Sequence, residues 1–452
     1  MSNWSSTQHK VFESITEKRK NILLTGPAGA GKSEVIKNIV KFFKSEKKKI
    51  GVTAVQTTAS LFIGGTTLHS YMHLTNERLK LSNSQILQEV LTITRFVNSL
   101  KNLECLIIDQ IDLVDLRTFE LIDMILREVK QESLPFGGLQ MVFVGDFYKT
   151  VNQKKYIFQT QLFWDCIDEM DELKDMYRQT DLKFVGILNR IRRNKMNDED
   201  VKLINECVRK AEIGPIIPTL FLDETSRLDV HTENLKCLDA LDGDDYPFPV
   251  FYGKSRNTET EKLCSIVNPV ESLKIGSQVM LCHNLNVDEG LICGIRGVVV
   301  GFTEKNVDEK TDFLKIETKW YLPKDVSLPI VQFLSGQKLK IPYFKETKEE
   351  GESFIWRIGL QYAWYTNIYI SEGLTLDCVR MNLNKQSQPY LALSRVKSLD
   401  NFFLEEGITR RLFQIDKAII DFYDFPFHLQ KNLSSQVTEL ASEKEILEFL
   451  QK

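Results

Sequence analysis

The sequence predicts an α/β fold of two lobes, each a parallel sheet flanked by helices, with a small β insertion in the second lobe. Apolar strands alternate with helical stretches over residues 1–150, and the same alternation returns after about residue 183. A stretch rich in Gly and β-branched residues then interrupts the second alternation. At 452 residues the chain is too long for one core and should divide into domains.

The first lobe is predicted over residues 1–182. Its strands read NILLTG, IGVTA, CLIIDQ and LQMVFVGD, and each carries a small or acidic residue at its carboxyl end. Open α/β sheets place their ligands at these ends, so the strand tips are the expected site. The polar stretch between Tyr71 and Leu100 is predicted as a helical insertion, near residues 71–100, and not as part of the sheet.

The second lobe is predicted in two parts, residues 183–282 and 358–425. Between them, residues 283–357 contain GLICGIRGVVVGF, DFLKIETKWYL, LPIVQF and KLKIPYF, which indicate a small antiparallel barrel. Residues 426–452 are predicted as a C-terminal helix that packs back on the body, because apolar residues after Ser435 recur at helical spacing.

The composition is that of a globular protein in water, with 42% hydrophobic and 27% charged residues. No apolar run approaches the roughly 20 residues needed to cross a bilayer, so no membrane partner is expected. The opening MSNWSSTQHK has neither the charged nor the apolar region of a secretory signal. We therefore expect a soluble, intracellular protein, nuclear if eukaryotic or viral.

Eight cysteines without a CxxC pair indicate reduced thiols and not a disulfide framework. Cys282, His283 and Cys293 come nearest to a zinc set, but a fourth ligand is not evident. The net charge of −4 means that any nucleic acid must bind in a locally basic groove. Two basic runs, Lys41–Lys49 and Arg190–Lys195, could contribute, although a solvated helix face is the alternative for each.

Residues 26–33 read GPAGAGKS, between the strand NILLT and a helical run. This strand, loop and helix form the setting of a GxxxxGK[ST] phosphate-binding loop, whose backbone N–H groups surround the phosphates at a helix N-terminus. Lys32 would reach the β- and γ-phosphates, and Ser33 would bind magnesium. ATP and Mg²⁺ are therefore the predicted cofactors. The residues assigned to the nucleotide loop are Gly26, Pro27, Ala28, Gly29, Ala30, Gly31, Lys32 and Ser33.

The stretch LIIDQ, residues 106–110, supplies the second half of the nucleotide site. Asp109 ends an apolar strand and is suited to hold magnesium. The next position usually carries a glutamate that activates the attacking water, but here it is Gln110. An amide can orient a water molecule but cannot accept its proton. Because loss of a general base costs about 10²- to 10⁴-fold in rate, hydrolysis is expected to be slow.

Five further stretches accompany the two nucleotide motifs along the chain. They are TAVQTTASLFIGGTTLHS from Thr53, LPFGGLQMVFVGDF from Leu134, YRQTDLKFVGILNRIR from Tyr177, LKIGSQVMLCHNLNVDEGLICGIRGVVVGF from Leu273 and QPYLALSRVKSLDN from Gln388. In this order, the motifs resemble the PIF-one/RecD-like branch of superfamily 1B DNA helicases over nearly the whole chain. The resemblance implies two RecA-like lobes with ATP between them, an SH3-like insertion in the second lobe, and 5′-to-3′ motion on single-stranded DNA.

The resemblance also assigns roles to single residues. Gln8 would read the adenine, while Arg178 in YRQ and Arg395 in ALSR would reach the γ-phosphate. Guanidinium groups suit this task because they are always ionised and form paired hydrogen bonds to phosphate. For either arginine taken alone, a surface ion pair is the alternative.

The loop GGTTLHS, residues 64–70, resembles the DNA-contacting segment of the family, where backbone and hydroxyl groups meet phosphates. His69 would lie at the strand groove, with a buried, hydrogen-bonded histidine as the alternative. Phe136 and Tyr390 could stack on bases, although core packing explains either ring equally well. The residues assigned to DNA are Thr53, Gly64, Gly65, Thr66, His69, Ser70, Phe136 and Tyr390.

The sequence departs from the family at three elements that couple DNA to ATP. The first is Gln110, and the second is Lys149 in GDFYKTVN, which stands where the family has glutamine. The prolines that usually follow are Val151 and Asn152 here. The third is NIYISEG, residues 367–373, which replaces the THKSQG stretch of the family.

Two hypotheses address these departures. Lys149 could partly offset the missing carboxylate by adding positive charge near the γ-phosphate. Gln110 could be an engineered trap that replaces glutamate, but a single trap mutation does not explain the other departures. Natural divergence is therefore the favoured interpretation.

The leading functional prediction is an ATP-dependent DNA helicase or translocase in replication, repair or recombination. Its expected partners are single-stranded DNA, 5′-tailed duplexes and replication or repair proteins, and we expect a monomer. The alternative is a degenerate helicase that binds ATP and single-stranded DNA as a scaffold or regulatory subunit. An RNA helicase or a P-loop signalling ATPase has no support beyond the phosphate-binding loop and the acidic strand.

Overall fold

The computed structural model of the chain divides into two compact units, which are described one at a time. The first contains the described residues within Met1–Glu206, Ser387–Leu399 and Gly407–Lys452, and the second those within Cys207–Gln386 and Asp400–Glu406. The described residues are 4–149, 155–179, 181–208, 219–222, 246–252, 270–283, 285, 291, 295–305, 320–321, 323, 325–333, 336–347, 354–368, 371, 375–376, 379–385, 388–425 and 427.

A six-stranded, wholly parallel sheet forms the centre of the first unit, in the order β3-β2-β4-β5-β1-β6. The four strands predicted from the sequence are β1, β2, β4 and β5, so this part of the α/β prediction is confirmed. Two short strands that the sequence did not signal complete the edges. The bounds are β1 Ile22–Thr25, β2 Ile50–Ala54, β3 Thr66–Thr67, β4 Cys105–Asp109, β5 Gln140–Val144 and β6 Glu169–Glu172.

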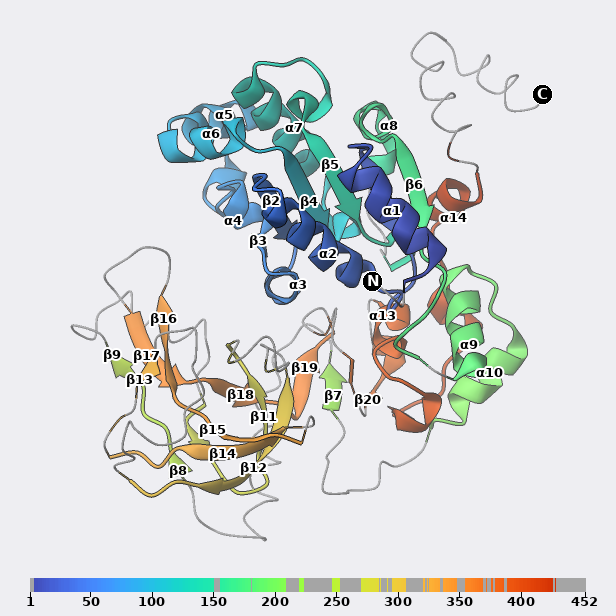
Figure 1. Ribbon diagram of the computed structural model, residues 1–452. Coiled ribbons are helices and arrows are strands. Elements are labelled where there is room, and N and C mark those ends of the chain that lie inside the picture. The colour runs from blue at the N-terminus through green and yellow to red at the C-terminus, as the bar shows by residue number, and fades with distance from the viewer. Residues whose placement is uncertain are drawn as a thin grey trace. The chain divides into compact units, whose positions relative to one another are not determined.

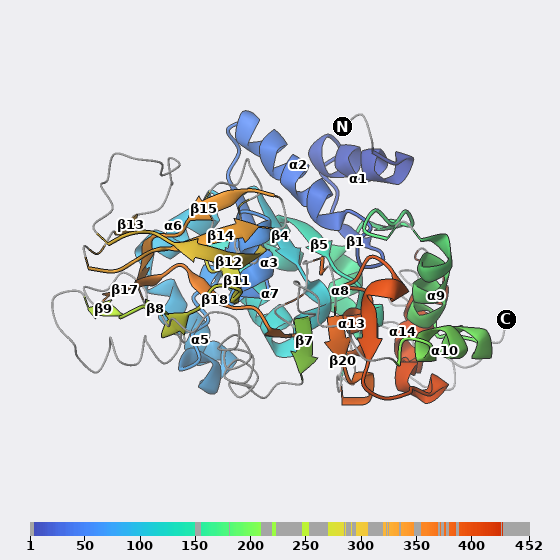
Figure 2. The same ribbon diagram turned by 90° about the horizontal axis from the view of Figure 1, so that it is seen from below.

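Helices cover both faces of this sheet, with α1 and α2 on one side and α7 and α8 on the other (Figure 2). Successive strand residues point to opposite faces, so Ile22 and Leu24 of β1 meet α1 and α2, whereas Leu23 faces α7. The helices of this unit are α1 Ser6–Thr16, α2 Lys32–Ser45, α3 Thr57–Phe62, α4 Leu68–Tyr71, α5 Asn83–Leu91, α6 Thr94–Lys101, α7 Leu116–Lys130, α8 Gln161–Cys166, α9 Leu182–Arg192, α10 Asp198–Asn205, α13 Pro389–Leu393 and α14 Lys417–Asp424.

The predicted helical segment between Tyr71 and Leu100 is present as α5 and α6. Helix α5 begins at a capping box, in which Ser82 and Gln85 bond each other's backbone N–H. Buried Ile86, Val90 and Phe96 join these two helices to the core under α7. The insertion is therefore part of the first unit's core.

Helix α14 packs beside α8 and β6, although it lies far along the chain from them (Figure 1). Phe422 is 4% exposed and stacks on Phe158 with ring centroids 4.3 Å apart. Its ring also meets Phe147 edge-on at 5.4 Å and lies 5.9 Å from Trp164. Helix α14 therefore completes the aromatic core on this face of the sheet.

The second unit contains a parallel sheet, in the order β19-β7-β20-β21, and antiparallel sheets in the orders β15-β14-β12-β11-β18, β13-β16-β17-β9 and β10-β8. The second parallel sheet and the antiparallel pairing of the Gly-rich stretch were both predicted. The bounds are β7 Thr219–Leu222, β8 Tyr246–Pro247, β9 Phe251–Tyr252, β10 Ser272–Leu273, β11 Gln278–Leu281, β12 Arg296–Phe302, β13 Trp320–Tyr321, β14 Pro329–Phe333, β15 Lys338–Lys340, β16 Tyr343–Thr347, β17 Phe354–Ile358, β18 Leu360–Tyr362, β19 Tyr365–Asn367, β20 Val379–Met381 and β21 Phe402–Leu404.

Several sequence predictions stay predictions. These are the domain boundaries and the closed, SH3-like form of the insertion, although the first unit runs to Glu206, past the boundary predicted at residue 182. Apart from Phe427, the predicted C-terminal helix over residues 426–452 lies outside the described residues, as do Val151, Asn152 and Cys293. Among the helices that the structure describes, none has the length and apolar content to cross a membrane.

We predict that Phe422→Ala destabilises the protein by about 3–5 kcal/mol, because it leaves a cavity between four aromatic rings. Chemical denaturation monitored by circular dichroism measures the loss. Phe425→Ala is the matched control, since this ring lies directly after the same helix but is 44% exposed and should change stability by less than about 1 kcal/mol. Equal losses in the two variants would contradict the proposed docking of α14.

Candidate nucleotide-binding site

The loop of residues 26–31 leaves the carboxyl end of β1 and enters α2 at Lys32. β1 is buried along its whole length next to β5 and β6, so the loop starts from a fixed point in the sheet. Gly31 caps α2 in the left-handed conformation, with φ of 86°. The loop therefore presents its backbone at the N-terminus of a 14-residue helix, where phosphate is favoured.

Glycine is required in this loop because other groups approach its backbone closely. A Cβ on Gly29 would lie 2.6 Å from Cβ of Arg178, and one on Gly31 would lie 2.9 Å from Nε2 of Gln8. Both glycines also have φ near +85°, a conformation that residues with a side chain rarely adopt. The same contacts show that Gln8 and Arg178, two residues assigned from the sequence, lie against the loop.

Lys32 folds over the loop that precedes it. Its Nζ donates hydrogen bonds to the carbonyl oxygens of Gly26, at 2.6 Å, and Pro27, at 3.0 Å. Burial of the ammonium group, followed by the charge of Lys149, lowers the pKa of Lys32 to about 7. Arg192 lowers this pKa further, while the carboxylates of Asp146 and Asp109 oppose the effect.

This crowding of cations tests whether the site suits a nucleotide. Lys149 and Arg192 are near enough to Lys32 to disfavour its charged form, so a bound anion would relieve this repulsion. A polyphosphate would supply that charge where the loop N–H groups and the helix end already favour it. The residues present therefore fit a nucleoside triphosphate.

Magnesium would be held by Ser33, in the first turn of α2, and Asp109, at the end of β4. Mg²⁺ is usually bound through one or two protein ligands together with the substrate's phosphates, and this pair matches that pattern. Asp109 is 8% exposed, and its Oδ1 accepts a hydrogen bond from the N–H of Gln110 at 2.9 Å. Among the described residues there is no group of three or more His, Cys, Asp or Glu side chains that could hold a metal ion.

Gln110, the residue in place of the usual glutamate, is paired with Gln56. Its Oε1 accepts from the backbone N–H of Gln56 at 2.9 Å, and its Nε2 donates to Oε1 of Gln56 at 3.2 Å. Gln110 itself adopts the left-handed conformation, with φ of 60°. Gln56 lies directly before α3, so the pair joins the end of β4 to the segment that leads into residues 64–70. Sequence reasoning did not single out Gln56.

The two predicted arginines meet around Ser394 within the first unit. Nη1 of Arg178 donates to the carbonyl oxygen of Ser394 at 3.2 Å, beside Gly29 of the loop. Arg395 is 1% exposed and donates from Nε to the carbonyl of Leu391 at 3.0 Å. Arg178 thus lies at the phosphate loop, whereas these contacts of Arg395 are to its own helical turn. Their role toward a γ-phosphate stays a prediction.

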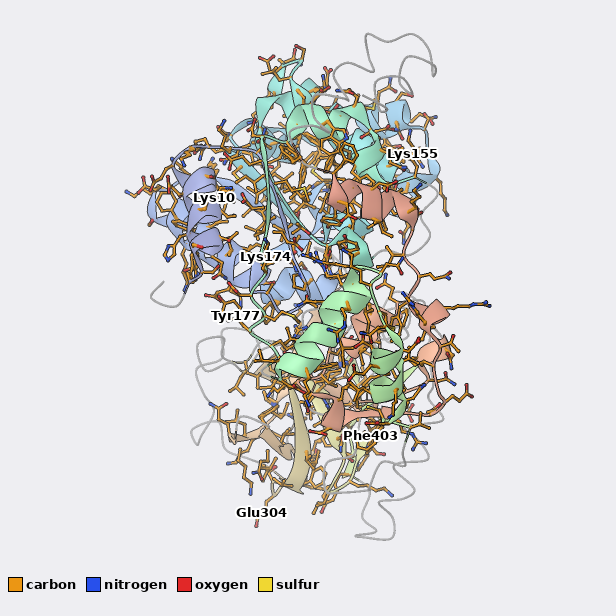
Figure 3. The ribbon with its side chains drawn as sticks, turned by 90° about the vertical axis from the view of Figure 1, so that its right-hand side faces the viewer. Lys10, Lys155, Lys174, Tyr177, Glu304 and Phe403 are labelled. Carbon is orange, nitrogen blue, oxygen red and sulfur yellow. The ribbon has the colours of Figure 1, made fainter. Side chains whose placement is uncertain are left out.

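Gln8 and Tyr177 both lie next to Gly31 of the phosphate loop. Tyr177 is 52% exposed, its hydroxyl donates to Oε1 of Gln8 at 3.3 Å, and its ring carbons lie near Gly31. Figure 3 shows Tyr177 and Lys174 on the stretch of chain between β6 and α9. An exposed ring next to a glutamine amide suits stacking on, and hydrogen bonding to, a flat base.

Asp146 and Arg192 are the main site residues that sequence reasoning missed. Arg192 donates from Nε to Oδ2 of Asp146 at 2.8 Å and from Nη2 to Oδ1 at 3.0 Å, and neither side chain is more than 1% exposed. Burial alone would raise the pKa of Asp146, but the charge and hydrogen bonds of Arg192 hold it below its usual range. Asp146 lies in the motif GDF and Arg192 in the run RIRRNK, but nothing in the sequence indicates that these two residues form an ion pair.

The basic run Arg190–Lys195 is largely paired with carboxylates. Arg190 binds Asp200 and Arg193 binds Glu172, in addition to the Arg192 pair. A cavity of about 320 Å³ opens here beside the phosphate loop. It is lined by Pro27, Glu172, Lys174, Asn189, Arg190, Arg192, Arg193 and Lys195. The other run, Lys41–Lys49, covers the end of α2 and the turn after it, and is mostly exposed.

The predicted DNA-contacting loop lies at the surface, next to β2. Gly64, Thr66 and Ser70 are exposed, and His69 is half-buried. A Cβ on Gly65 would lie 2.2 Å from the carbonyl oxygen of Val52, so this glycine lets the loop pack on the sheet. These residues are therefore accessible to a ligand, and their contact with DNA stays a prediction.

Three other residues assigned to DNA are buried. Thr53 is fully buried in β2, and its hydroxyl donates to the carbonyl of Ile107 at 2.8 Å. Phe136 is also fully buried and meets Phe119 edge-on at 5.2 Å, which corresponds to the core-packing alternative. Tyr390 is 6% exposed, and burial raises its pKa. In this conformation neither ring presents an open face on which a base could stack.

Two protein-family models match this chain. The model of the family described as PIF1-like helicase matches residues 3–214, and the model of the 2B domain of DNA helicase Pif1 matches residues 262–302. The ATP-dependent DNA helicase PIF1 of Xenopus laevis is 30% identical over 448 residues, covering 96% of this chain and 66% of the relative. The human PIF1 helicase is 30% identical over 410 residues, covering 87% and 59%. The chain thus spans somewhat less than two thirds of such relatives.

Solved structures agree in fold. A Pif1 helicase from Candida albicans superposes with a TM-score of 0.75 at 25% identity, covering 94% of this chain and 99% of that one. A Bacteroides Pif1 in complex with ADP-AlF4 gives a TM-score of 0.67 at 23% identity, covering 93% and 96%. These likenesses show that the two parallel sheets are those of the RecA-like lobes of such helicases. The chain therefore belongs to the PIF1-like helicase family.

Proposed function

We propose that this protein is an ATP-dependent DNA helicase or translocase that moves 5′-to-3′ on single-stranded DNA. The observation that carries the proposal is that Lys32 and Arg178 lie against the loop of residues 26–31, which enters the N-terminus of α2. Membership of a family whose curated relatives are named ATP-dependent DNA helicases supports the same activity. A structurally similar protein, Pif1 from Bacteroides, was solved bound to single-stranded DNA, which supports single-stranded DNA as a partner.

Each residue of the proposed site has a separate role in ATP hydrolysis. Ser33 and Asp109 would hold the magnesium ion that accompanies ATP. Lys32, Lys149 and Arg178 place positive charge around the phosphates, where it stabilises the transition state of phosphoryl transfer. The buried position of Lys149, on the turn after Asp146, supports its proposed compensating role. Tyr177 and Gln8 would bind the base.

We further propose that the protein acts as a monomer on 5′-tailed duplexes, alongside proteins of replication, repair or recombination. In a eukaryotic or virus-infected cell its place would be the nucleus. The loop of residues 64–70 is the proposed contact with the DNA backbone, because Gly64, Thr66 and Ser70 are exposed there.

A scaffold role is the second candidate, and the Gln56–Gln110 pair favours it. The amide that would have to orient the attacking water is already bonded at both its oxygen and its nitrogen. Such a protein would bind ATP and single-stranded DNA but hydrolyse slowly. DNA-stimulated phosphate release separates the two candidates, because a scaffold would show less than a few-fold stimulation.

We predict that Lys32→Ala weakens ATP binding at least tenfold and lowers DNA-stimulated phosphate release about 100-fold or more, because it removes the cation nearest the loop. Fluorescent-nucleotide titration and a phosphate-release assay with single-stranded DNA measure the two effects. Lys44→Ala, at the exposed end of the same helix, is the control and should match the wild type. Unchanged ATP affinity in Lys32→Ala would overturn the nucleotide site.

We predict that Gln110→Glu raises DNA-stimulated hydrolysis by about 10²-fold or more, because it restores a general base beside Asp109. The carboxylate can keep the bond from the N–H of Gln56, whose side-chain amide can turn to donate to it. Steady-state ATP turnover is the measurement, and Gln110→Ala, which also breaks the pair but adds no base, is the control. Equal turnover in wild type and Gln110→Glu would show that this position does not limit the rate.

A further inference from the structure

The hydroxyl group of Tyr423 joins α14 to the base of the phosphate loop. Thr25 is the last residue of β1 before the loop, and Phe147 follows the neighbouring strand β5. Tyr423, in the last turn of α14, reaches both places. Its hydroxyl lies 2.8 Å from Oγ1 of Thr25 and 3.1 Å from the N–H of Phe147.

The same hydroxyl also reaches Asp146. Tyr423 donates to Oδ1 of Asp146 at 3.4 Å, and accepts from the N–H of Phe147. A tyrosine hydroxyl has one proton and two lone pairs, so all contacts are satisfied if the hydroxyl of Thr25 donates to it as well. Burial, with the charge of Asp146, raises the pKa of Tyr423 well above its usual value, which keeps the proton in place.

Stacking holds the ring of Tyr423 in this position. It lies on Tyr148 with centroids 4.3 Å apart and planes 11° from parallel. The guanidinium of Arg192 lies 4.7 Å from the centroid of Tyr148 and 5.7 Å from that of Tyr423, while it grips Asp146 with two hydrogen bonds. The hydroxyl is therefore aimed by an aromatic stack and a buried ion pair.

These contacts connect α14 to the charges of the nucleotide site. Asp146 is the carboxylate that most favours the charged form of Lys32, and it also accepts from Tyr423. A shift of Asp146 would change the electrostatic environment of Lys32, and a shift of Thr25 would displace the start of the phosphate loop. Tyr423 is placed to prevent both shifts, because it spans the ends of β1 and β5.

We propose that Tyr423 is a positioning residue for nucleotide binding, through which the docked α14 fixes the start of the phosphate loop relative to Asp146. The inference rests on the proposed nucleotide site and adds to it an element from the far end of the chain. It assigns to α14 a part in ATP affinity beyond its packing in the aromatic core.

The test compares Tyr423→Phe with Tyr156→Phe in the full chain. Both variants remove one hydroxyl that joins α14 to the core, since Tyr156 donates to Oδ2 of Asp416 at 3.1 Å. Only Tyr423 contacts the phosphate-loop strand and Asp146. We expect Tyr423→Phe to weaken the binding of fluorescent ATP about 3- to 10-fold, because it removes the hydroxyl that contacts Thr25 and Asp146, and Tyr156→Phe to leave it unchanged. Melting temperatures should fall in both variants, and further in Tyr423→Phe, whose hydroxyl makes three contacts.

A double variant makes the pathway explicit. Thr25→Val removes the partner hydroxyl with little change in shape, so Thr25→Val combined with Tyr423→Phe should bind ATP no more weakly than Tyr423→Phe alone. ATP affinity in Tyr423→Phe within twofold of that in Tyr156→Phe would overturn the inference. If Lys32→Ala also binds ATP normally, the proposed nucleotide site fails as well. If Lys32→Ala loses affinity, only the role of Tyr423 fails.

Discussion

The charge balance around the phosphate loop is the constraint on which the first unit depends. Three cations, Lys32, Lys149 and Arg192, lie close together in a largely buried region, and burial disfavours each of them. The carboxylate of Asp146 offsets this cost, but only because Arg192 grips it with two hydrogen bonds. An arriving polyphosphate would meet positive charge that the fold already holds in place, which limits the reorganisation needed on binding.

The Gln56–Gln110 pair changes the meaning of the altered catalytic position. Seen in sequence, Gln110 is a glutamate that has lost its charge. In the structure it is half of a two-way amide pair, and its partner precedes the helix that leads to the loop of residues 64–70. The side-chain amide of Gln110 accepts from the backbone N–H of Gln56 and donates to its side-chain oxygen, so Gln110 is integrated with its surroundings.

Much of the fold followed from local patterns. The four apolar strands β1, β2, β4 and β5 were recognisable because central strands of a parallel sheet are buried on both faces. The short edge strand β6 was not, since its EMDE sequence is acidic and has no apolar run. The roles of Phe136 and Tyr390 could not be predicted from local patterns. Sequence alone does not distinguish an aromatic residue that packs in a core from one that stacks on a base, and the burial of both rings decides for core packing in this structure.

The amino-acid sequence alone predicted the phosphate-binding loop, Asp109 as a magnesium ligand and the two-sheet α/β architecture, because each prediction depends on neighbours within a few residues. Tertiary structure decided which distant groups surround that loop. Arg192 pairs with Asp146 across 46 residues, Tyr423 reaches Thr25 across 398, and Gln56 meets Gln110 across 54. Such contacts arise only when the strand ends are brought to one edge of the sheet and α14 docks beside them, so no local spacing in the chain records them.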